Sequence, residues 1–297
     1  MWDELFRNND LSYIPGLVLA KRTSFGIGGA VPAYLEPPDR LSFIRAVHLC
    51  RARQIRYRIM GRGTNVLAAD RPKTEVVIST RKITSISESN GYIEAECGAT
   101  LRELAQYVLH SGRVGVAGLA DIPGTVGAAI RGNAGAFGDS VEQYVESVEV
   151  YDAAKLTVRR VSKAALSFGY RFSALLGMES LVVLSARFAF PKGDPVRERR
   201  RLSQCREIRQ STQPVQCRTC GSVFRRYNGI SAGYYLERAG CKGLCRGGAE
   251  ISRLHANFVI NSNNATADDV LRLIDDSRER VYRQFGILLI PEVERIV

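Results

Sequence analysis

The segment from Gly115 to Gly138 restricts the fold more than any other part of this chain. It holds seven Gly residues but only two charged residues, Asp121 and Arg131. A flexible linker of this kind would be polar and rich in Ser, whereas this segment is apolar. Buried glycines indicate that a flat or bulky group lies close to the backbone. The composition alone leaves two interpretations open, a packed β-corner and a ligand-binding loop.

A second glycine-containing loop, Gly61-Arg-Gly-Thr-Asn-Val-Leu67, follows an apolar run. Glycine lets the backbone turn sharply and present successive N–H groups to a phosphate. The loop has no third Gly at the Rossmann spacing and no Gly-Lys-Ser/Thr, so neither common nucleotide-binding fingerprint is present. Taken alone it predicts a simple turn. Two such loops on one domain could hold a diphosphate.

The hydrophobic pattern predicts short strands and helices in mixed order. A capping box of Thr100 and Glu103 begins one of the helices. We expect helices at 41–54, 100–111 and 266–285, short strands at 59–67 and 76–79 around a Gly-rich turn, and strands at 145–151, 156–161, 181–190 and 257–261. This mixture favours α+β layers over a regular doubly wound sheet.

The chain is strongly basic, with 297 residues and a net charge of +12. Such a charge attracts anions, but does not distinguish nucleic acid from phosphorylated small molecules. The densest basic run, residues 197–209, has six Arg and two Glu. Its apolar residues recur at helical spacing behind Asp194, a candidate N-cap, and Pro195; they are Val196, Leu202, Cys205 and Ile208. We interpret this run as a solvated amphipathic helix rather than a nucleic-acid-binding surface.

The sequence has no run approaching the roughly 20 apolar residues that span a bilayer. The chain starts Met-Trp-Asp-Glu-Leu, and Pro15 interrupts its first apolar patch, unlike a signal peptide. We therefore expect a cytoplasmic protein without membrane insertion. The seven cysteines, an odd number, favour reduced thiols over a disulfide framework.

Two alternative chemistries have weaker support. The pairs Cys217/Cys220 and Cys241/Cys245 resemble a four-thiolate zinc site in number and separation, which suggests a zinc-stabilised nucleic-acid-binding protein as the main rival. Four separate reduced thiols are the favoured interpretation, and we expect no metal.

Gly221-Ser-Val-Phe224 does not form the Gly-x-Ser-x-Gly of a hydrolase elbow, and the chain has only three His, so a Ser-His-Asp hydrolase has little support.

A series of motifs resembles the UDP-N-acetylenolpyruvoylglucosamine reductase family. About ten occur in the family's order, from residue 20 to the end, and the length is similar to the shorter form that lacks an inserted loop. The motifs are Thr23-Ser-Phe-Gly-Ile-Gly-Gly29, Gly61–Leu67, Ile122-Pro-Gly-Thr-Val-Gly127, Asn133-Ala-Gly-Ala-Phe-Gly138, Tyr170-Arg171-x-Ser173, Gln213-Pro214, Gly221–Phe224, Glu237-x-Ala-Gly-x-Lys-Gly243, Gly247-Gly-Ala249, His255-Ala-Asn-Phe258 and Pro291-Glu-Val293.

The resemblance implies a fold of the α+β class. It would comprise a two-lobed FAD-binding unit of the vanillyl-alcohol-oxidase (PCMH) type, with lobes at 1–72 and 73–193, and a small α+β substrate-binding domain at 194–297. FAD would bind non-covalently, and NADPH would be the reductant. The substrate would be UDP-N-acetylglucosamine enolpyruvate, reduced to UDP-N-acetylmuramate for peptidoglycan synthesis. A related FAD oxidoreductase acting on another acidic substrate is the alternative.

The resemblance also implies roles for individual residues. Arg171 would hold the substrate carboxylate and its developing charge. Ser222 would deliver a proton as general acid, and Glu292 would stabilise the enolic intermediate as a neutral acid. Residues expected to bind substrate are Tyr170, Arg225 and His255. Residues expected to bind FAD are Gly61, Gly63, Thr64, Asn65, Ile122, Gly124, Thr125, Val126, Gly127, Asn133 and Gly135.

The chain departs from the family pattern at several positions. Arg226 and Tyr227 stand where the family usually has Asn-Pro, and Ala117 stands where an acidic residue is common. The departures leave all three proposed catalytic groups in place.

Overall fold

The protein is described by a computed structural model covering residues 2–297. The chain folds into two compact units. The larger unit comprises the residues up to 14, 33–62 and 76–207, and the smaller unit comprises 15–32, 63–75 and 208–297. Two N-terminal segments thus belong to the same compact unit as the C-terminal part of the chain.

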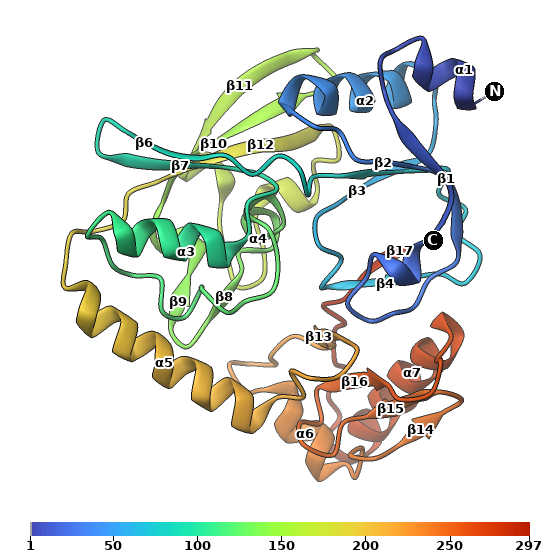
Figure 1. The fold of residues 1–297 in the computed structure, drawn as a ribbon. Coiled ribbons are helices and arrows are strands. Elements are labelled where there is room, and N and C mark those ends of the chain that lie inside the picture. Colours follow the sequence, from blue (N-terminus) through green and yellow to red (C-terminus); the bar gives the residue numbers. More distant parts are fainter. Residues whose placement is uncertain (1) are drawn as a thin grey trace. The chain divides into compact units, whose positions relative to one another are not determined.

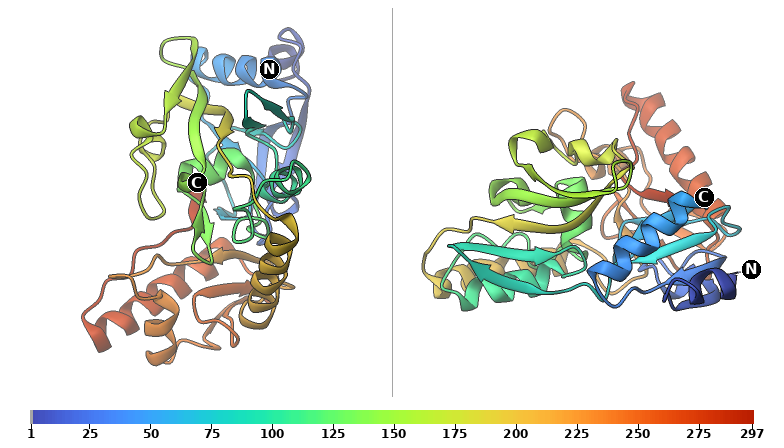
Figure 2. Two further views of the ribbon diagram at one scale, coloured as in Figure 1. Left: turned by 90° about the vertical axis from the view of Figure 1, so that its left-hand side faces the viewer. Right: turned by 90° about the horizontal axis from the view of Figure 1, so that it is seen from above.

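The first sheet has the strand order β1-β2-β5-β3. Its strands are β1 (Tyr13–Val18), β2 (Ala30–Leu35), β3 (Tyr57–Met60) and β5 (Val76–Ser79). Both β2 and β3 run parallel to β5, and all four β5 residues are buried, as expected for a central parallel strand. Helix α2 (Arg40–Ala52) packs against β5 (Figures 1 and 2). Its N-cap Asp39 accepts the Ser42 N–H at 2.8 Å.

The larger unit also contains an antiparallel sheet with the order β11-β10-β12-β7-β6 (Figure 1). Helix α4 packs against β12 and β7, and α3 starts with the predicted capping box of Thr100 and Glu103. The bounds are β6 (Ile86–Ser89), β7 (Tyr92–Glu96), β10 (Val145–Asp152), β11 (Thr157–Ser162), β12 (Leu181–Phe188), α3 (Leu101–His110) and α4 (Val126–Gly132).

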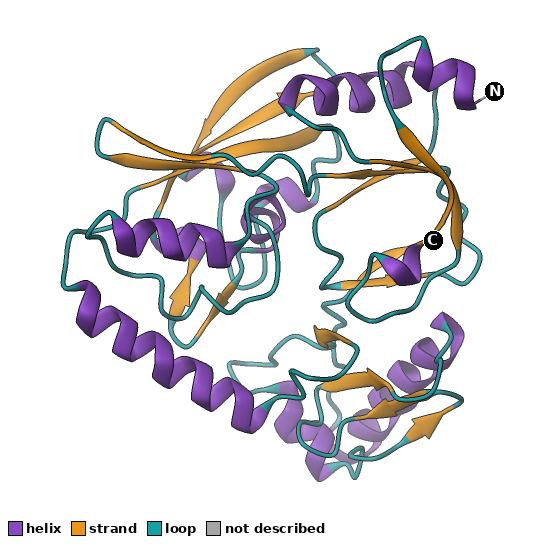
Figure 3. Ribbon diagram, in the orientation of Figure 1, coloured by secondary structure: helices purple, strands orange, loops and turns teal. Residues whose placement is uncertain are grey.

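The smaller unit has a four-stranded sheet with the order β13-β16-β15-β14, and α7 packs against β14 and β15 (Figure 3). Its elements are β13 (Thr219–Ser222), β14 (Cys245–Arg246), β15 (Ala249–Ile251), β16 (Phe258–Asn261), α6 (Ala232–Arg238) and α7 (Ala267–Phe285). A parallel pair, β4 (Val66–Ala68) and β17 (Glu294–Ile296), ties the C-terminal strand to an N-terminal segment. Both carboxylate oxygens of Asp70 accept the Ala267 N–H at 3.0 Å, next to the α7 N-cap.

The unit's separate hydrophobic core explains why early segments join it. Phe25, Ile27 and Leu67 are buried among residues of α6 and α7.

The remaining short elements are α1 (Trp2–Arg7), the hairpin strands β8 (Gly135–Ala136) and β9 (Asp139–Ser140), and four 3-10 turns at Leu19–Lys21, Val141–Gln143, Ala164–Leu166 and Ala174–Leu176.

Helix α5 (Pro195–Thr212) forms where the basic run predicted a helix, and the Asp194 carboxylate accepts the Val196 N–H at 2.8 Å. The predicted apolar stripe is only partly correct. Val196 and Ile208 are 55% and 51% exposed, whereas Glu198 and Cys205 are the buried residues of the helix. A carboxylate therefore lies on the side that periodicity assigned to apolar side chains.

Most other predicted elements are present within a few residues. The main difference is the expected strand at 59–67, which is two strands, β3 and β4, separated by the Gly61–Asn65 turn. Within residues 2–297, no helix combines the length and the apolar character needed to cross a bilayer.

Candidate functional site

The two glycine-rich loops meet within the larger unit. Gly61 follows β3, and Thr125 is the N-cap of α4. A Cβ atom at Gly61 would lie only 2.6 Å from Thr125 Oγ1, so any larger residue here would force the Thr125 side chain to move. The carbonyl oxygens of Gly61 and Arg62 accept hydrogen bonds from the Arg81 guanidinium at 3.3 and 2.9 Å. The loops are therefore in contact, and the Arg81 guanidinium anchors the loop that begins at Gly61.

An unsatisfied hydroxyl lies beside this contact. Thr80 follows β5, and its N–H donates to the carbonyl of Met60, the residue before Gly61, at 3.0 Å. Thr80 is 4% exposed, and its Oγ1 is buried with no hydrogen-bond partner among the described residues. Ligands of sheets with parallel strands bind at the carboxyl ends of those strands, where Thr80 and Gly61 lie. A close-approach glycine and an orphaned hydroxyl at this edge fit a polar cofactor such as FAD.

Not every N–H group of the Ile122–Gly127 loop can contact a cofactor. The Val126 N–H donates to the Ala99 carbonyl at 2.8 Å, and the Gly127 N–H donates to the Cys97 carbonyl at 2.9 Å. A Cβ atom at Gly127 would lie 3.0 Å from that of Cys97, so this glycine serves packing. The prediction that both glycine-rich loops offer N–H groups to a diphosphate therefore does not extend to Val126 and Gly127, whose N–H groups are already engaged.

Arg171 occupies a strained loop that Asn133 holds in place. Its φ of +52° lies in the left-handed region, which non-glycine residues rarely adopt and which often occurs at functional sites. Its guanidinium donates to the Gly135 carbonyl at 2.9 Å and lies 5.3 Å from the Tyr170 ring centroid. Asn133, itself left-handed, donates to the Gly169 carbonyl at 2.8 Å. Four predicted site residues, Asn133, Gly135, Tyr170 and Arg171, thus form one cluster in the larger unit.

The segments that carry Ser222 and Glu292 are hydrogen-bonded to each other in the smaller unit. Ser222 ends β13 after Gly221, whose φ is +83°. The Glu292 N–H donates to the carbonyl of Val223 at 2.7 Å, and both Ser222 and Glu292 are half-buried. The predicted hydroxyl donor and the predicted carboxyl group therefore lie on hydrogen-bonded segments that are far apart in the sequence.

Asn65 joins the same arrangement from the loop before β4. Its side-chain amide donates to the Glu292 carbonyl at 3.1 Å, and its own carbonyl accepts the Glu294 N–H at 3.0 Å. Asn65 was expected to bind FAD; the structure shows that its side-chain N–H and its carbonyl also hold the segment that carries Glu292. Gly63 adopts a φ of +67° and accepts the Ser24 N–H at 3.1 Å, while Thr64 lies beside Gly221.

Asn257 is a supporting residue that sequence reasoning did not single out. Its side chain accepts the Phe224 N–H and donates to the Phe224 carbonyl, both at 2.9 Å, and its backbone carbonyl accepts the Val223 N–H at 2.9 Å. Asn257 is 5% exposed. Its place in the His255–Phe258 motif is visible in the sequence, but its bidentate contact with Phe224, thirty-three residues earlier, is not.

Arg225 and His255, the predicted substrate-binding residues of the smaller unit, differ in the groups that they can present to a ligand. The Arg225 N–H donates to the Ile290 carbonyl at 3.0 Å, and its buried Nε has no hydrogen-bond partner among the described residues. Arg225 can therefore receive an anionic group. His255 instead accepts the Asn257 N–H on Nδ1 at 3.2 Å and packs on Phe258, and burial lowers its pKa. Burial therefore favours the neutral form of the ring, whose Nδ1 is engaged within the protein.

The cysteines do not gather into a metal site. Cys217 and Cys245 are exposed, whereas Cys220 and Cys241 are buried. Among residues 2–297 no group of three or more His, Cys, Asp or Glu is placed to hold a metal ion. Burial, with a smaller contribution from Glu292, raises the pKa of Cys220 to about 12.

Comparisons with known proteins agree with the motif order. Residues 31–162 match the family described as FAD binding domain, and residues 213–296 match the C-terminal domain of UDP-N-acetylenolpyruvoylglucosamine reductase. The Synechococcus sp. (strain RCC307) UDP-N-acetylenolpyruvoylglucosamine reductase is 38% identical over 97% of this chain and 95% of its own length. This chain belongs to the UDP-N-acetylenolpyruvoylglucosamine reductase family. The Thermosipho melanesiensis reductase is 37% identical over 91% of each chain.

A solved member of the UDP-N-acetylenolpyruvoylglucosamine reductase family has the same fold. The Thermus caldophilus reductase superposes with a TM-score of 0.81 at 29% identity, covering 97% of this chain and 100% of that one. This match and the FAD binding domain confirm the predicted α+β class and the predicted flavin-binding unit.

Proposed function

We propose that this chain catalyses the FAD-dependent, NADPH-driven reduction of UDP-N-acetylglucosamine enolpyruvate to UDP-N-acetylmuramate. The reaction would serve peptidoglycan precursor synthesis in the cytoplasm, with no nucleic acid or membrane partner. One observation carries the proposal: Ser222 and Glu292 are held on hydrogen-bonded segments of the smaller unit. A hydroxyl and a carboxyl group so placed suit a reaction that adds a proton to a carbon bearing developing negative charge.

Bound FAD, with NADPH as its reductant, would supply the hydride for the terminal vinyl carbon of the enolpyruvyl group. The remaining work falls to side chains of this protein. The Arg171 guanidinium, kept in its loop by Asn133 and Gly135, binds the substrate carboxylate and stabilises its developing negative charge. The Ser222 hydroxyl delivers a proton to the neighbouring α-carbon, so the double bond gains one hydride and one proton. Glu292, as a neutral acid, stabilises the enolic carboxylate before that proton arrives.

The residues proposed to hold FAD divide by what they can contribute. Gly61, Gly124 and Thr125 lie in the two contacting loops, with the buried Thr80 hydroxyl beside them. Val126 and Gly127 would act through packing, because their N–H groups are engaged. The proposed set also includes Gly63, Thr64, Asn65, Ile122, Asn133 and Gly135.

Arg225, Tyr170 and His255 are proposed to bind the substrate. The buried Nε of Arg225, which has no hydrogen-bond partner within residues 2–297, supports an anion contact, and the 52% exposed Tyr170 ring offers a surface for stacking. The functional division into FAD-binding lobes at 1–72 and 73–193 and a substrate-binding domain at 194–297 is part of the same proposal.

An anaerobic rapid-mixing experiment tests the proposed reaction. Protein loaded with FAD and reduced with NADPH should regain its oxidised flavin absorption when UDP-N-acetylglucosamine enolpyruvate is added. UDP-N-acetylglucosamine, which lacks the vinyl group, is the matched control and should leave the flavin reduced. A protein that binds no FAD, or reduced flavin that does not respond to the enolpyruvyl sugar, would contradict the proposal. Reoxidation by a different acidic enol ether alone would favour the related-oxidoreductase alternative.

A further inference from the structure

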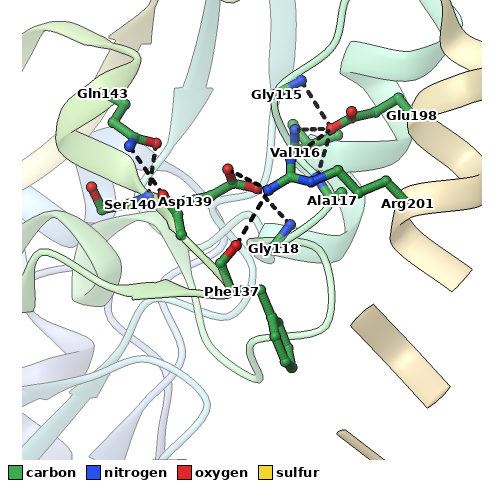
Figure 4. Close-up of polar contacts among 11 residues, drawn as sticks. Gly115, Val116, Ala117, Gly118, Phe137, Asp139, Ser140, Gln143, Glu198 and Arg201 are labelled. Carbon is green, nitrogen blue, oxygen red and sulfur yellow. Dashed lines mark hydrogen bonds and ion pairs between the residues drawn. The ribbon is translucent and has the colours of Figure 1, made fainter. Parts of the chain in front are cut away.

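Helix α5 presents a buried carboxylate to the start of the glycine-rich segment. Glu198 Oε1 accepts three consecutive backbone N–H groups, from Gly115 at 3.0 Å and from Val116 and Ala117 at 2.8 Å each (Figure 4). Glu198 is only 8% exposed. Successive N–H groups directed at one point form an anion-binding concavity, and hydrogen bonds to a charged acceptor are stronger than neutral ones.

A second carboxylate holds the next residue of the same segment. Asp139 Oδ2 accepts the Gly118 N–H at 2.7 Å, while its Oδ1 pairs with Arg201 of α5 at 2.8 Å (Figure 4). Arg201 also donates to the Phe137 carbonyl at 3.3 Å. Position 118 requires glycine here, since a Cβ atom would lie 2.2 Å from the Ala136 carbonyl oxygen. Four successive N–H groups, 115 to 118, are thus fixed by two carboxylates.

The contacts made by α5 extend to Asp121, the residue before the Ile122–Gly127 loop. Arg206 of α5 pairs with Asp121, with Nε to Oδ2 at 2.8 Å and a second bond at 3.2 Å. Burial raises the pKa of the Asp121 carboxyl, but the guanidinium groups of Arg206 and Arg102 more than offset this and hold it below its usual value. Three charged side chains of one helix, Glu198, Arg201 and Arg206, therefore anchor the segment between residues 115 and 139.

The segment that α5 holds is also connected to the cluster of Asn133, Gly135, Tyr170 and Arg171. Asp139 pairs with Ala136 in the β8–β9 hairpin, and the adjacent Gly135 carbonyl accepts the Arg171 guanidinium. A glycine-rich segment has many backbone conformations, so a ligand that binds it must also order it unless the protein has done so already. The α5 anchors supply that order on both sides of the loop that contacts Gly61.

We propose that Glu198, assisted by Arg201, is a positioning residue that preorganises the glycine-rich segment for FAD. This inference rests on the proposed function, because it assumes that the segment binds the flavin cofactor. Glu198 would not touch FAD; it would act through the backbone that it holds. The Ala117 N–H, for example, donates to the Glu198 carboxylate, which lies some eighty residues further along the chain.

Titration of the apoprotein with FAD, followed by flavin fluorescence, tests this inference. Glu198→Gln keeps the shape of the side chain but removes its charge, and should raise the dissociation constant for FAD roughly ten- to hundredfold, the range expected for charged hydrogen bonds. Glu207→Gln, an exposed position on the same helix, is the matched control and should bind FAD like the wild type. Arg201→Lys, whose single nitrogen cannot reproduce the contacts of one guanidinium nitrogen with Asp139 and Phe137 and of the other with Glu198 at 3.8 Å, should weaken FAD binding several-fold.

The outcomes are distinguishable. Wild-type protein that takes up no FAD would overturn the proposed function itself. Wild-type uptake, with Glu198→Gln binding FAD within twofold of the wild type, would overturn the positioning role, even if the melting temperature of the apoprotein fell. If Glu198→Gln does not fold, Arg201→Lys decides: its side chain is 39% exposed, and an unchanged dissociation constant in this folded variant would refute the inference. A weakened affinity, with an altered flavin absorption band in the bound state, would support it.

Discussion

The backbone N–H of Glu292 donates to the carbonyl oxygen of Val223 over 2.7 Å, which places Glu292 against the residue that follows Ser222. The isolated bridge between Phe224 and Pro291 and the Arg225 to Ile290 hydrogen bond extend this pairing. Both proposed acids therefore depend on one short antiparallel contact. A shift of either segment would move its acid relative to the other.

Replacing Ser222 with Ala should separate the two half-reactions. Reduction of FAD by NADPH needs no proton from Ser222 and should stay nearly intact. Reduction of the enolpyruvyl sugar should slow by about 10²–10⁴, the usual contribution of a positioned proton donor. Stopped-flow absorbance resolves the two steps, and Ser203→Ala on α5 is the control. Equal slowing of both steps would remove Ser222 from the proton transfer.

Arg171→Lys should also impair the second half-reaction, because an ammonium group cannot replace the planar fork that binds a carboxylate. The variant also loses the present geometry of the Gly135 contact and of the Tyr170 ring. We expect the rate of substrate reduction to fall at least tenfold, measured by the same stopped-flow method. Arg159→Lys, on the exposed strand β11, is the control. Unchanged turnover in Arg171→Lys would exclude Arg171 from the reaction.

Asn257→Ala should destabilise the smaller unit. The change leaves the buried N–H and carbonyl of Phe224 without their side-chain partner, at a cost of about 2–4 kcal/mol in the free energy of unfolding. Chemical denaturation monitored by circular dichroism measures this loss, and exposed Asn263→Ala should change it little. A loss of unfolding free energy no greater than that of Asn263→Ala would show that the two hydrogen bonds between Asn257 and Phe224 contribute little to stability.

Thiol reactivity should separate the seven cysteines into two classes. Burial, followed by the nearby Glu96 charge, raises the pKa of Cys97 to about 12, and Cys220 has a similar value. Only thiolates react, so at pH 8 a disulfide reagent should modify exposed Cys217 and Cys245 in the native protein. The other five thiols should react only after denaturation. Rapid modification of more than two thiols in the folded protein would contradict this.

The sequence predicted local structure well where short-range chemistry decides it. Thr100 and Glu103 signalled the start of α3, and the helix expected at 266–285 is α7, which the structure shows to begin with a capping box of Thr266 and Asp269. These signals depend on side chains that hydrogen-bond within one turn. The order of motifs likewise identified the family.

Contacts between segments that are distant in the sequence could not be predicted from such local patterns. Periodicity placed Val196 and Ile208 on the buried face of α5, yet Glu198 is buried because three backbone N–H groups some eighty residues earlier satisfy its charge. A lone Glu in the first turn of an Arg-rich helix was the only available hint. The engaged N–H groups of Val126 and Gly127 were hidden for the same reason, since their acceptors lie on another segment.

The stability of the protein should fall as the pH drops through the range where His255 titrates. Burial lowers the pKa of His255 in the folded state, and its Nδ1 must stay unprotonated to accept the Asn257 N–H. Below the unfolded-state pKa of about 6.5, the unfolded chain binds a proton that the folded chain does not, so the free energy of unfolding decreases until the lower folded pKa is reached. Urea denaturation at pH values between 5 and 8 measures this slope. His255→Gln should flatten it, whereas His110→Gln, at an exposed position, should leave it unchanged; an equal slope in both variants would show that another group is responsible.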